Sequence, residues 1–75
     1  MMITVYTKNQ CQQCNFTKSM MDREAIEYEL INIDEDAEAL AYAQTLGFMS
    51  APIIVVDGEA LFAGFQPDRI MSLKV

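Results

Sequence analysis

Residues 3–14, Ile-Thr-Val-Tyr-Thr-Lys-Asn-Gln-Cys-Gln-Gln-Cys, place an apolar run directly before two cysteines. Residues 3–7 are β-branched or aromatic and predict a strand. Residues 8–10 are polar and predict a loop, and the chain from Cys11 to about Glu24 has a helical pattern. The two cysteines are therefore expected where the first strand meets the first helix.

The next segments predict a second strand and a second helix. The first helix is expected to turn an apolar face of Phe16, Met20 and Ile26 toward the rest of the protein. Tyr28–Ile33 predicts the second strand. Asp34 is expected to be the N-cap of a helix that begins with Glu35, Asp36 and Glu38, continues through Ala37, Leu40, Ala41, Gln44 and Leu46, and gives way to a left-handed Gly47.

The last third of the chain predicts a hairpin followed by a short helix. Pro52–Val56 is a buried strand in this interpretation, and Asp57-Gly58 is a strong signal for a two-residue hairpin turn. Ala60–Ala63 is the expected return strand. Residues 64–66 turn the chain, and Pro67 can occupy the first position of a helix that packs through Ile70, Met71 and Leu73.

These elements occur in the order β-α-β-α-β-β-α. The first β-α-β unit is expected to cross over right-handedly, which makes its two strands parallel. The hairpin makes the last two strands antiparallel. We therefore expect an α/β fold with a mixed four-stranded sheet flanked by three helices, formed by residues 1–75 as a single domain.

The composition narrows the classes of partner. The net charge is −6, from 11 acidic and 5 basic residues, which disfavours nucleic acid and an anionic membrane surface. No apolar run approaches the roughly 20 residues of a membrane span. The N-terminal residues have neither a basic head nor a signal-peptide core. We therefore expect a cytoplasmic protein, and we expect it to be a monomer.

Position at a helix start gives the two cysteines different roles. Unpaired N–H groups and the helix dipole favour an anion there, so we expect Cys11 as a thiolate, and Lys8 just upstream adds positive charge. Cys14 would lie one turn inward. Cys11 is therefore the expected nucleophile on a partner's disulfide, and Cys14 is expected to resolve the mixed disulfide. The resulting Cys11–Cys14 disulfide must then be reduced by another molecule.

Two other uses of the cysteines stay open from the residues alone. They can be small buried hydrophobes, although the polar Gln12 and Gln13 between them weigh against this. They can also be two ligands of zinc or an iron–sulfur cluster, which would need a second chain or an outside thiol. The chain has no histidine, which removes Cys/His catalysis and a single-chain Cys2His2 zinc site. We expect no metal and no bound cofactor, only the redox-active disulfide.

Several residues are candidates for contact with a partner. Ala51-Pro52 precedes a strand, and the proline either simply begins that strand or forms a cis peptide beside the dithiol, leaving the Ala51 backbone free to pair with an extended partner segment. Phe48 and Phe62 are interpreted as core residues, whereas Phe65 lies in a turn and is the best candidate for an exposed ring. The full predicted partner surface is Lys8, Gln12, Gln13, Met49, Ala51, Pro52, Gly64 and Phe65.

These motifs together resemble the glutaredoxin branch of the thioredoxin superfamily, and within it the NrdH-redoxins. The resemblance covers essentially the whole chain. The matching segments are residues 3–7, Cys11-Gln12-Gln13-Cys14, Asn32-Ile33-Asp34, Gly47-Phe48, Ala51-Pro52 and Gly64-Phe65-Gln66-Pro67-Asp68. The Gly-Phe-x-Pro-Asp turn is the more specific of the motifs, because a CxxC pair alone occurs in many redox proteins.

The resemblance implies a thioredoxin-like fold with Pro52 cis and close to Cys11. It also implies that thioredoxin reductase supplies electrons, that class Ib ribonucleotide reductase receives them, and that Cys11 and Cys14 are nucleophile and resolving cysteine. The alternative is a glutathione-dependent dithiol glutaredoxin. A typical glutaredoxin has Pro-Tyr between its cysteines and holds glutathione with a Gly-Gly pair, whereas this chain has Gln12-Gln13 and places Phe65 after Gly64. The bulky ring, and Pro67 without an N–H, should weaken glutathione binding.

Overall fold

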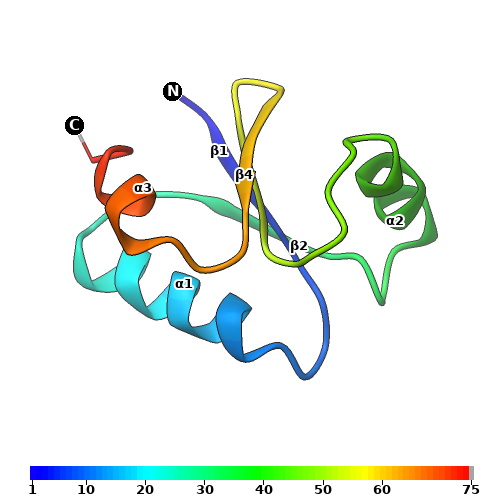
Figure 1. Cartoon of the computed structure of the whole chain (residues 1–75), viewed down its shortest axis with the longest axis horizontal. Helices are drawn as coiled ribbons and strands as arrows, with labels where there is room; N and C mark the ends of the chain where they lie inside the picture. Colours follow the sequence, from blue (N-terminus) through cyan, green and yellow to red (C-terminus); the bar gives the residue numbers. More distant parts are fainter. Residues whose placement is uncertain (75) are drawn as a thin grey trace.

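Four strands and three helices follow one another in the predicted order in the computed structural model, which describes residues 1–74 (Figure 1). The elements are β1 (Ile3–Thr7), α1 (Gln12–Arg23), β2 (Glu29–Asn32), α2 (Ala37–Gln44), β3 (Ile53–Val56), β4 (Glu59–Ala63) and α3 (Pro67–Met71). Within the described residues, no helix is both long enough and apolar enough to cross a bilayer.

The strands form one mixed sheet in the order β2-β1-β3-β4. β1 pairs in parallel with β2 and antiparallel with β3, and β3 pairs antiparallel with β4. Asp57 and Gly58 connect the last two strands with φ angles of 51° and 85°, the left-handed pair that a tight hairpin turn requires. The predicted mixed sheet and the predicted hairpin are both confirmed.

Helices cover both faces of this sheet. Figure 1 shows α1 and α3 on one side and α2 on the other. Because side chains alternate between the two faces of a strand, Val5 of β1 packs on the α1 and α3 side and Tyr6 packs on the α2 side. The larger core, on the α1 and α3 side, consists of Ile3, Val5, Met20, Met21, Ile26, Ile54, Phe62, Ile70 and Leu73. The smaller core consists of Tyr6, Ala39, Ala43, Ile53 and Val55.

The second helix begins later than predicted. Its N-cap is Asp36, whose carboxylate accepts the N–H of Ala39 at 3.1 Å, and not Asp34. The Asp34 carboxylate accepts the N–H of Asn9 at 2.8 Å, so it binds the loop before the cysteines instead of capping α2. The helix also ends before Leu46, whereas Gly47 has the predicted left-handed backbone, with a φ of 82°.

The predicted apolar face of α1 is wrong at Phe16. This side chain is 53 % exposed, whereas Met20 and Ile26 are buried as expected. The buried side of the helix also includes Cys14 and Thr17. Since each helical residue turns by about 100°, Phe16 lies roughly 200° around the helix from Cys14 and faces solvent.

Candidate active site

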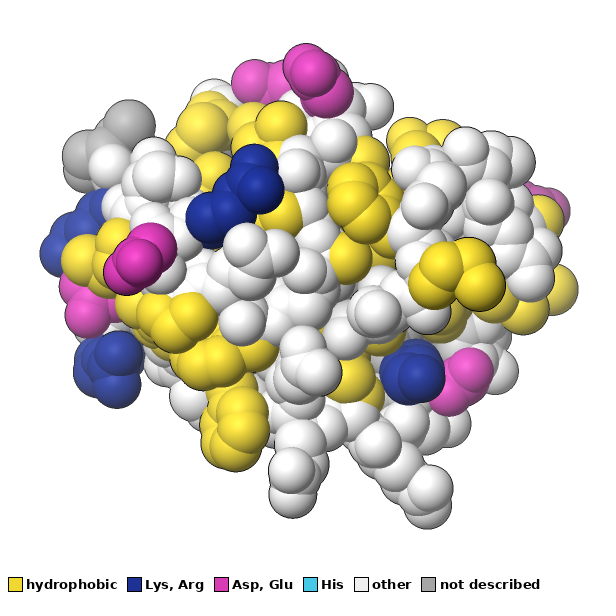
Figure 2. Space-filling model, viewed as in Figure 1, with side chains coloured by type: hydrophobic (Ala, Val, Ile, Leu, Met, Phe, Trp, Pro, Cys, Tyr) yellow, Lys and Arg dark blue, Asp and Glu magenta, His cyan; other side chains and the backbone are white. Residues whose placement is uncertain are grey.

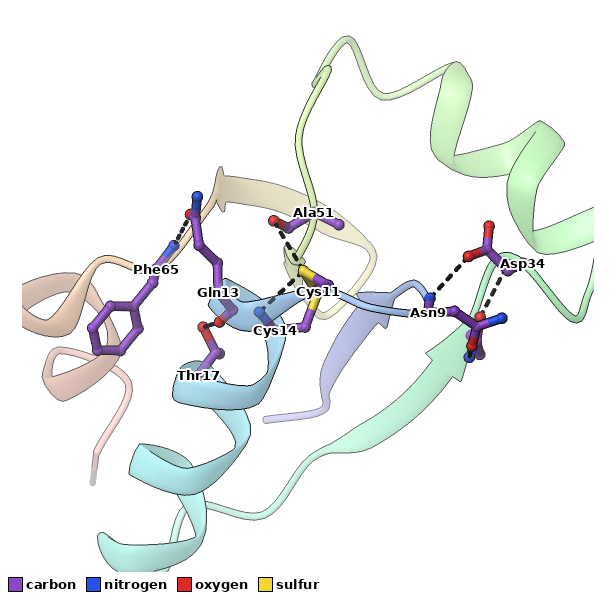
Figure 3. Close-up of a disulfide and its surroundings, with 9 residues drawn as sticks. Asn9, Cys11, Gln13, Cys14, Thr17, Asp34, Ala51 and Phe65 are labelled. Atoms are coloured by element: carbon purple, nitrogen blue, oxygen red, sulfur yellow. Dashed lines mark hydrogen bonds between the residues drawn. A yellow bond between two sulfur atoms is a disulfide. The ribbon is translucent and has the colours of Figure 1, made fainter.

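The two cysteines form a disulfide at the start of α1 (Figure 3). Their Cα atoms are 5.2 Å apart. Cys11 is the N-cap residue, with an extended backbone, and the N–H of Cys14 donates to the Cys11 sulfur at 3.1 Å. A helix N-cap accepts N–H groups that have no partner within the helix, and here a sulfur atom takes that role. The same N–H can therefore stabilise negative charge on Cys11 after the disulfide is reduced.

Access to the two sulfurs is unequal. Cys11 is 8 % exposed and Cys14 is completely buried. A cleft of about 350 Å³ opens at Cys11, and its other lining residues are Lys8, Gln12, Gln13, Met49, Ser50 and Ala51. Among the described residues that line the cleft, Lys8 is the one that carries a charge, and its positive charge favours a thiolate there. An incoming sulfur can reach Cys11 far more readily than Cys14.

A hydrogen-bonded polar cluster holds the loop before the cysteines. The Asp34 carboxylate accepts the N–H of Asn9 at 2.8 Å, as Figure 3 shows, and the N–H of Asp34 donates to Asn32 at 2.8 Å. The Asn32 amide donates in turn to the Asn9 side chain at 2.9 Å. These bonds join the loop that leaves β1 to the end of β2, so they fix where the chain enters α1. The sequence interpretation missed this role.

Ala51 and Pro52 lie beside Cys11 and are joined by a cis peptide bond. The Ala51 carbonyl oxygen is 3.8 Å from the Cys11 sulfur. The Pro52 carbonyl accepts the N–H of Gly64 at 2.8 Å, which attaches the turn after β4 to the start of β3. The sequence left open whether Pro52 simply begins a strand or forms a cis peptide bond, and the structure shows the cis peptide bond.

Gln13 bridges α1 to the turn after β4. Its side-chain oxygen accepts the N–H of Phe65 at 2.9 Å, and Figure 3 shows the side chain extending from α1 to that turn. A Cβ on Gly64 would lie 3.0 Å from the same oxygen, and Gly64 has a φ of 82°, so both space and backbone favour glycine. Gln13 was predicted to meet a partner, and the structure gives it an internal role as well.

Apolar side chains lie on two sides of the disulfide. The Phe65 ring packs in a tilted arrangement against the exposed ring of Phe16, with 5.6 Å between the ring centroids. On the other side, the Met49 side chain is fully exposed. Figure 2 shows that hydrophobic and uncharged side chains predominate over the start of α1 and the loop before β3. Such a surface suits contact with a protein better than contact with a small anion.

A second hollow, of about 410 Å³, adjoins the cleft. It shares Lys8, Met49, Ser50 and Ala51 with the cleft and extends along α2 and β3, where its other lining residues are Ile33, Leu40, Ala43, Gln44, Phe48 and Ile53. This lining is mostly apolar. Phe48, assigned to the core from sequence, is only partly buried and borders the hollow. Sequence reasoning missed the hollow because it lies between segments from different parts of the chain.

Six of the ten predicted site residues line the cleft, and the other four, Cys14, Pro52, Gly64 and Phe65, lie behind or beside it. The six are Lys8, Cys11, Gln12, Gln13, Met49 and Ala51. Pro52 is buried next to Ala51, while Gly64 and Phe65 form a neighbouring turn linked to the cleft by Gln13. Within residues 1–74 there is no group of three or more His, Cys, Asp or Glu side chains arranged to hold a metal ion.

The arrangement is suited to exchange of a disulfide. Cys11 has an accessible sulfur that accepts a helix N–H, and Cys14 lies within bonding distance behind it. The disulfide can take up two electrons and two protons to give two thiols, and the two thiols can pass two electrons on as the disulfide re-forms. This is the chemistry of a dithiol–disulfide oxidoreductase.

Comparison with known proteins indicates the same dithiol–disulfide chemistry. The Glutaredoxin family profile matches residues 3–61. The glutaredoxin-like protein NrdH of Escherichia coli K12 is 38 % identical over 73 residues, which is 97 % of this chain and 89 % of that protein. NrdH of Lactococcus lactis IL1403 is 40 % identical over 72 residues, covering 96 % and 99 %.

A solved structure extends the match to the fold. NrdH-redoxin from Escherichia coli, described as a glutaredoxin-like protein with a thioredoxin-like activity profile, superimposes with a TM-score of 0.89 at 37 % identity. The match covers 97 % of this chain and 95 % of that one. The predicted thioredoxin-like fold is confirmed.

Proposed function

This chain belongs to the glutaredoxin family, and on that premise we propose that it carries electrons from thioredoxin reductase to class Ib ribonucleotide reductase in the cytoplasm. The observation that carries the proposal is the turn at Gly64, where the N–H of Phe65 is already bonded to the Gln13 side chain. Membership of the family accounts for the dithiol chemistry, and the choice of donor and client is the proposal.

The proposed cycle moves two electrons and returns the protein to its disulfide. The Cys11 thiolate attacks one sulfur of the client disulfide, and the other client sulfur leaves as a thiolate. Cys14 then loses its proton and attacks Cys11, which releases the second client thiolate and forms the Cys11–Cys14 disulfide. Thioredoxin reductase reduces this disulfide to two thiols with electrons from NADPH. The unequal exposure of the two cysteines supports this order of attack.

The turn at Gly64 supports a protein donor over glutathione. In the glutaredoxin pattern, backbone N–H groups of this turn hold the tripeptide. Here the N–H of Phe65 is already bonded to Gln13, and the Phe65 ring packs on Phe16 over the same turn. A glutathione carboxylate would have to displace an internal hydrogen bond and a ring contact.

The surface around the cleft supports an extended protein segment as the client. We propose that such a segment lies along Ala51, next to Cys11, with Lys8, Gln12 and Met49 in contact at its sides.

A comparison of two donors tests this proposal. Oxidised protein is mixed with NADPH and thioredoxin reductase, or with NADPH, glutathione and glutathione reductase, and NADPH consumption is followed in the presence of class Ib ribonucleotide reductase. We expect turnover with thioredoxin reductase and deoxyribonucleotide formation that depends on this protein. Turnover in the glutathione system alone would support the alternative, a glutathione-dependent glutaredoxin. A Cys11→Ser variant is the matched control and should be inactive in both systems.

A further inference from the structure

Met49 differs from the other methionines in exposure and position. Its side chain is fully exposed, whereas Met20 and Met21 are buried in the larger core. It lies in the loop between α2 and β3 and lines both the cleft at Cys11 and the adjoining apolar hollow. A soft, oxidisable sulfur is therefore present at the point where the redox site meets solvent.

We propose that Met49 is an oxidation site, and that its conversion to methionine sulfoxide by hydroperoxides weakens docking of protein partners at Cys11. This inference rests on the proposed function, since it concerns the regulation of the same site. In the reaction the thioether sulfur attacks one peroxide oxygen and the O–O bond breaks. For hydrogen peroxide the products are the sulfoxide and water, so that the sulfur loses two electrons and the peroxide gains them.

Oxidation of Met49 is expected to weaken docking because of where this residue lies. A partner that brings a sulfur to Cys11 must cover the cleft, and Met49 is part of the wall of that cleft. The thioether can be covered at little cost, because it carries no strong hydrogen-bonding group. The sulfoxide carries a strongly polar oxygen, whose water is lost when a partner covers it unless the partner supplies a donor.

The modification is also expected to outlast oxidation of the dithiol. Peroxide converts Cys11 and Cys14 to their disulfide, which the normal electron donor reverses in each cycle. Thiol donors do not repair methionine sulfoxide at useful rates, because repair needs dedicated sulfoxide reductases. Protein oxidised at Met49 would therefore regain its dithiol and still dock poorly.

The first test measures the site of oxidation and does not depend on activity. The disulfide form of the protein is treated with hydrogen peroxide, so that the cysteines are protected, and each methionine is quantified by peptide mass spectrometry. We expect Met49 to be oxidised at least about tenfold faster than buried Met20 and Met21. Oxidation of Met20 or Met21 at the same rate as Met49 would overturn the assignment.

The second test measures the effect on docking. Treated and untreated proteins are compared for reduction by dithiothreitol and by thioredoxin reductase with NADPH. We expect the dithiothreitol rate to be unchanged, and the KM of the reductase for this protein to rise about fivefold after treatment. In Met49→Leu the ratio of treated to untreated KM should stay near one. In Met71→Leu, which removes a 41 % exposed methionine outside the cleft, the fivefold ratio should persist.

The outcomes separate this inference from the function on which it rests. Complete oxidation of Met49 with no change in KM would overturn the inference and leave the proposed function intact. Failure of the proposed function has a different signature, because the untreated protein would then accept no electrons from thioredoxin reductase.

Discussion

Substituting Gln13 by alanine and Phe65 by glycine is expected to let this protein use glutathione. The first change removes the oxygen that accepts the Phe65 N–H at 2.9 Å, and the second removes the ring that packs on Phe16 at 5.6 Å. Each single substitution removes only one of these two obstacles to glutathione binding. The double variant exposes a backbone N–H next to Gly64, as in the Gly-Gly turn of a typical glutaredoxin.

The size of the effect follows from the bond that becomes possible. A hydrogen bond from a backbone N–H to a carboxylate contributes about 1.5–3 kcal/mol. The turn is partly open to water, so the lower end applies, and the KM for glutathione should fall about tenfold. Loss of the internal hydrogen bond and the ring pair should lower the free energy of unfolding by roughly 2 kcal/mol. A domain with a typical stability of about 5–15 kcal/mol stays folded after that loss.

The assay is NADPH consumption with glutathione and glutathione reductase, measured over a range of glutathione concentrations. Circular dichroism before each run establishes that the variants are folded. Gln12→Ala is the matched control, because it removes the neighbouring glutamine, which makes no hydrogen bond through its side chain within residues 1–74. A folded double variant with the glutathione activity of the parent protein would show that the Gly64 turn does not select the donor.

Three further expectations concern stability and titration. The pKa of Tyr28 is raised to about 12, mainly by burial and also by its hydrogen bond to Asp22. The contribution of Tyr28 to the free energy of unfolding is therefore fully present below pH 10.0 and is lost as the pH rises toward 12. In the parent protein the urea-denaturation midpoint should fall over this pH range, and in Tyr28→Phe it should fall less. The side-chain hydrogen bond from Lys74, at 3.0 Å, lowers the pKa of Glu24, and Lys74→Ala should raise it again in an NMR carboxyl titration. The buried hydroxyl of Thr7 has no hydrogen-bond partner within residues 1–74, so Thr7→Val should raise the melting temperature by several degrees, corresponding to about 1 kcal/mol.

Most of the fold could be predicted because local chemistry and tertiary structure agree along most of the chain. The Asp57-Gly58 pair has one dominant use, a tight hairpin turn, and Pro67 begins α3 as its fixed φ favours. The error at Asp34 has a physical cause, since Asp34 and Asp36 are equally good capping residues in isolation. Contact with Asn9, 25 residues away in the sequence, decides between them.

The candidate site was predictable in its chemistry and less so in its supporting contacts. Helix position and CxxC spacing predicted that Cys11 is more accessible than Cys14, and the structure shows this difference in exposure. The Gln13–Phe65 bond was not predictable in the same way, because it joins residues 52 positions apart through a flexible side chain. The exposure of Phe16 could have been predicted, because Cys14 and Thr17 lie on the buried side of the helix and Phe16 lies on the other side.

The central claim is that Cys11 attacks and Cys14 resolves, and trapping of a mixed disulfide tests it most directly. The Cys14→Ser and Cys11→Ser variants are reduced, mixed with an oxidised client disulfide, quenched with acid and analysed by intact mass and peptide mapping. Cys14→Ser is predicted to accumulate a mixed disulfide on Cys11, because the resolving thiol is absent, while Cys11→Ser forms little or none through buried Cys14. Adducts that form readily through Cys14, and none through Cys11 in the folded Cys14→Ser variant, would contradict the account.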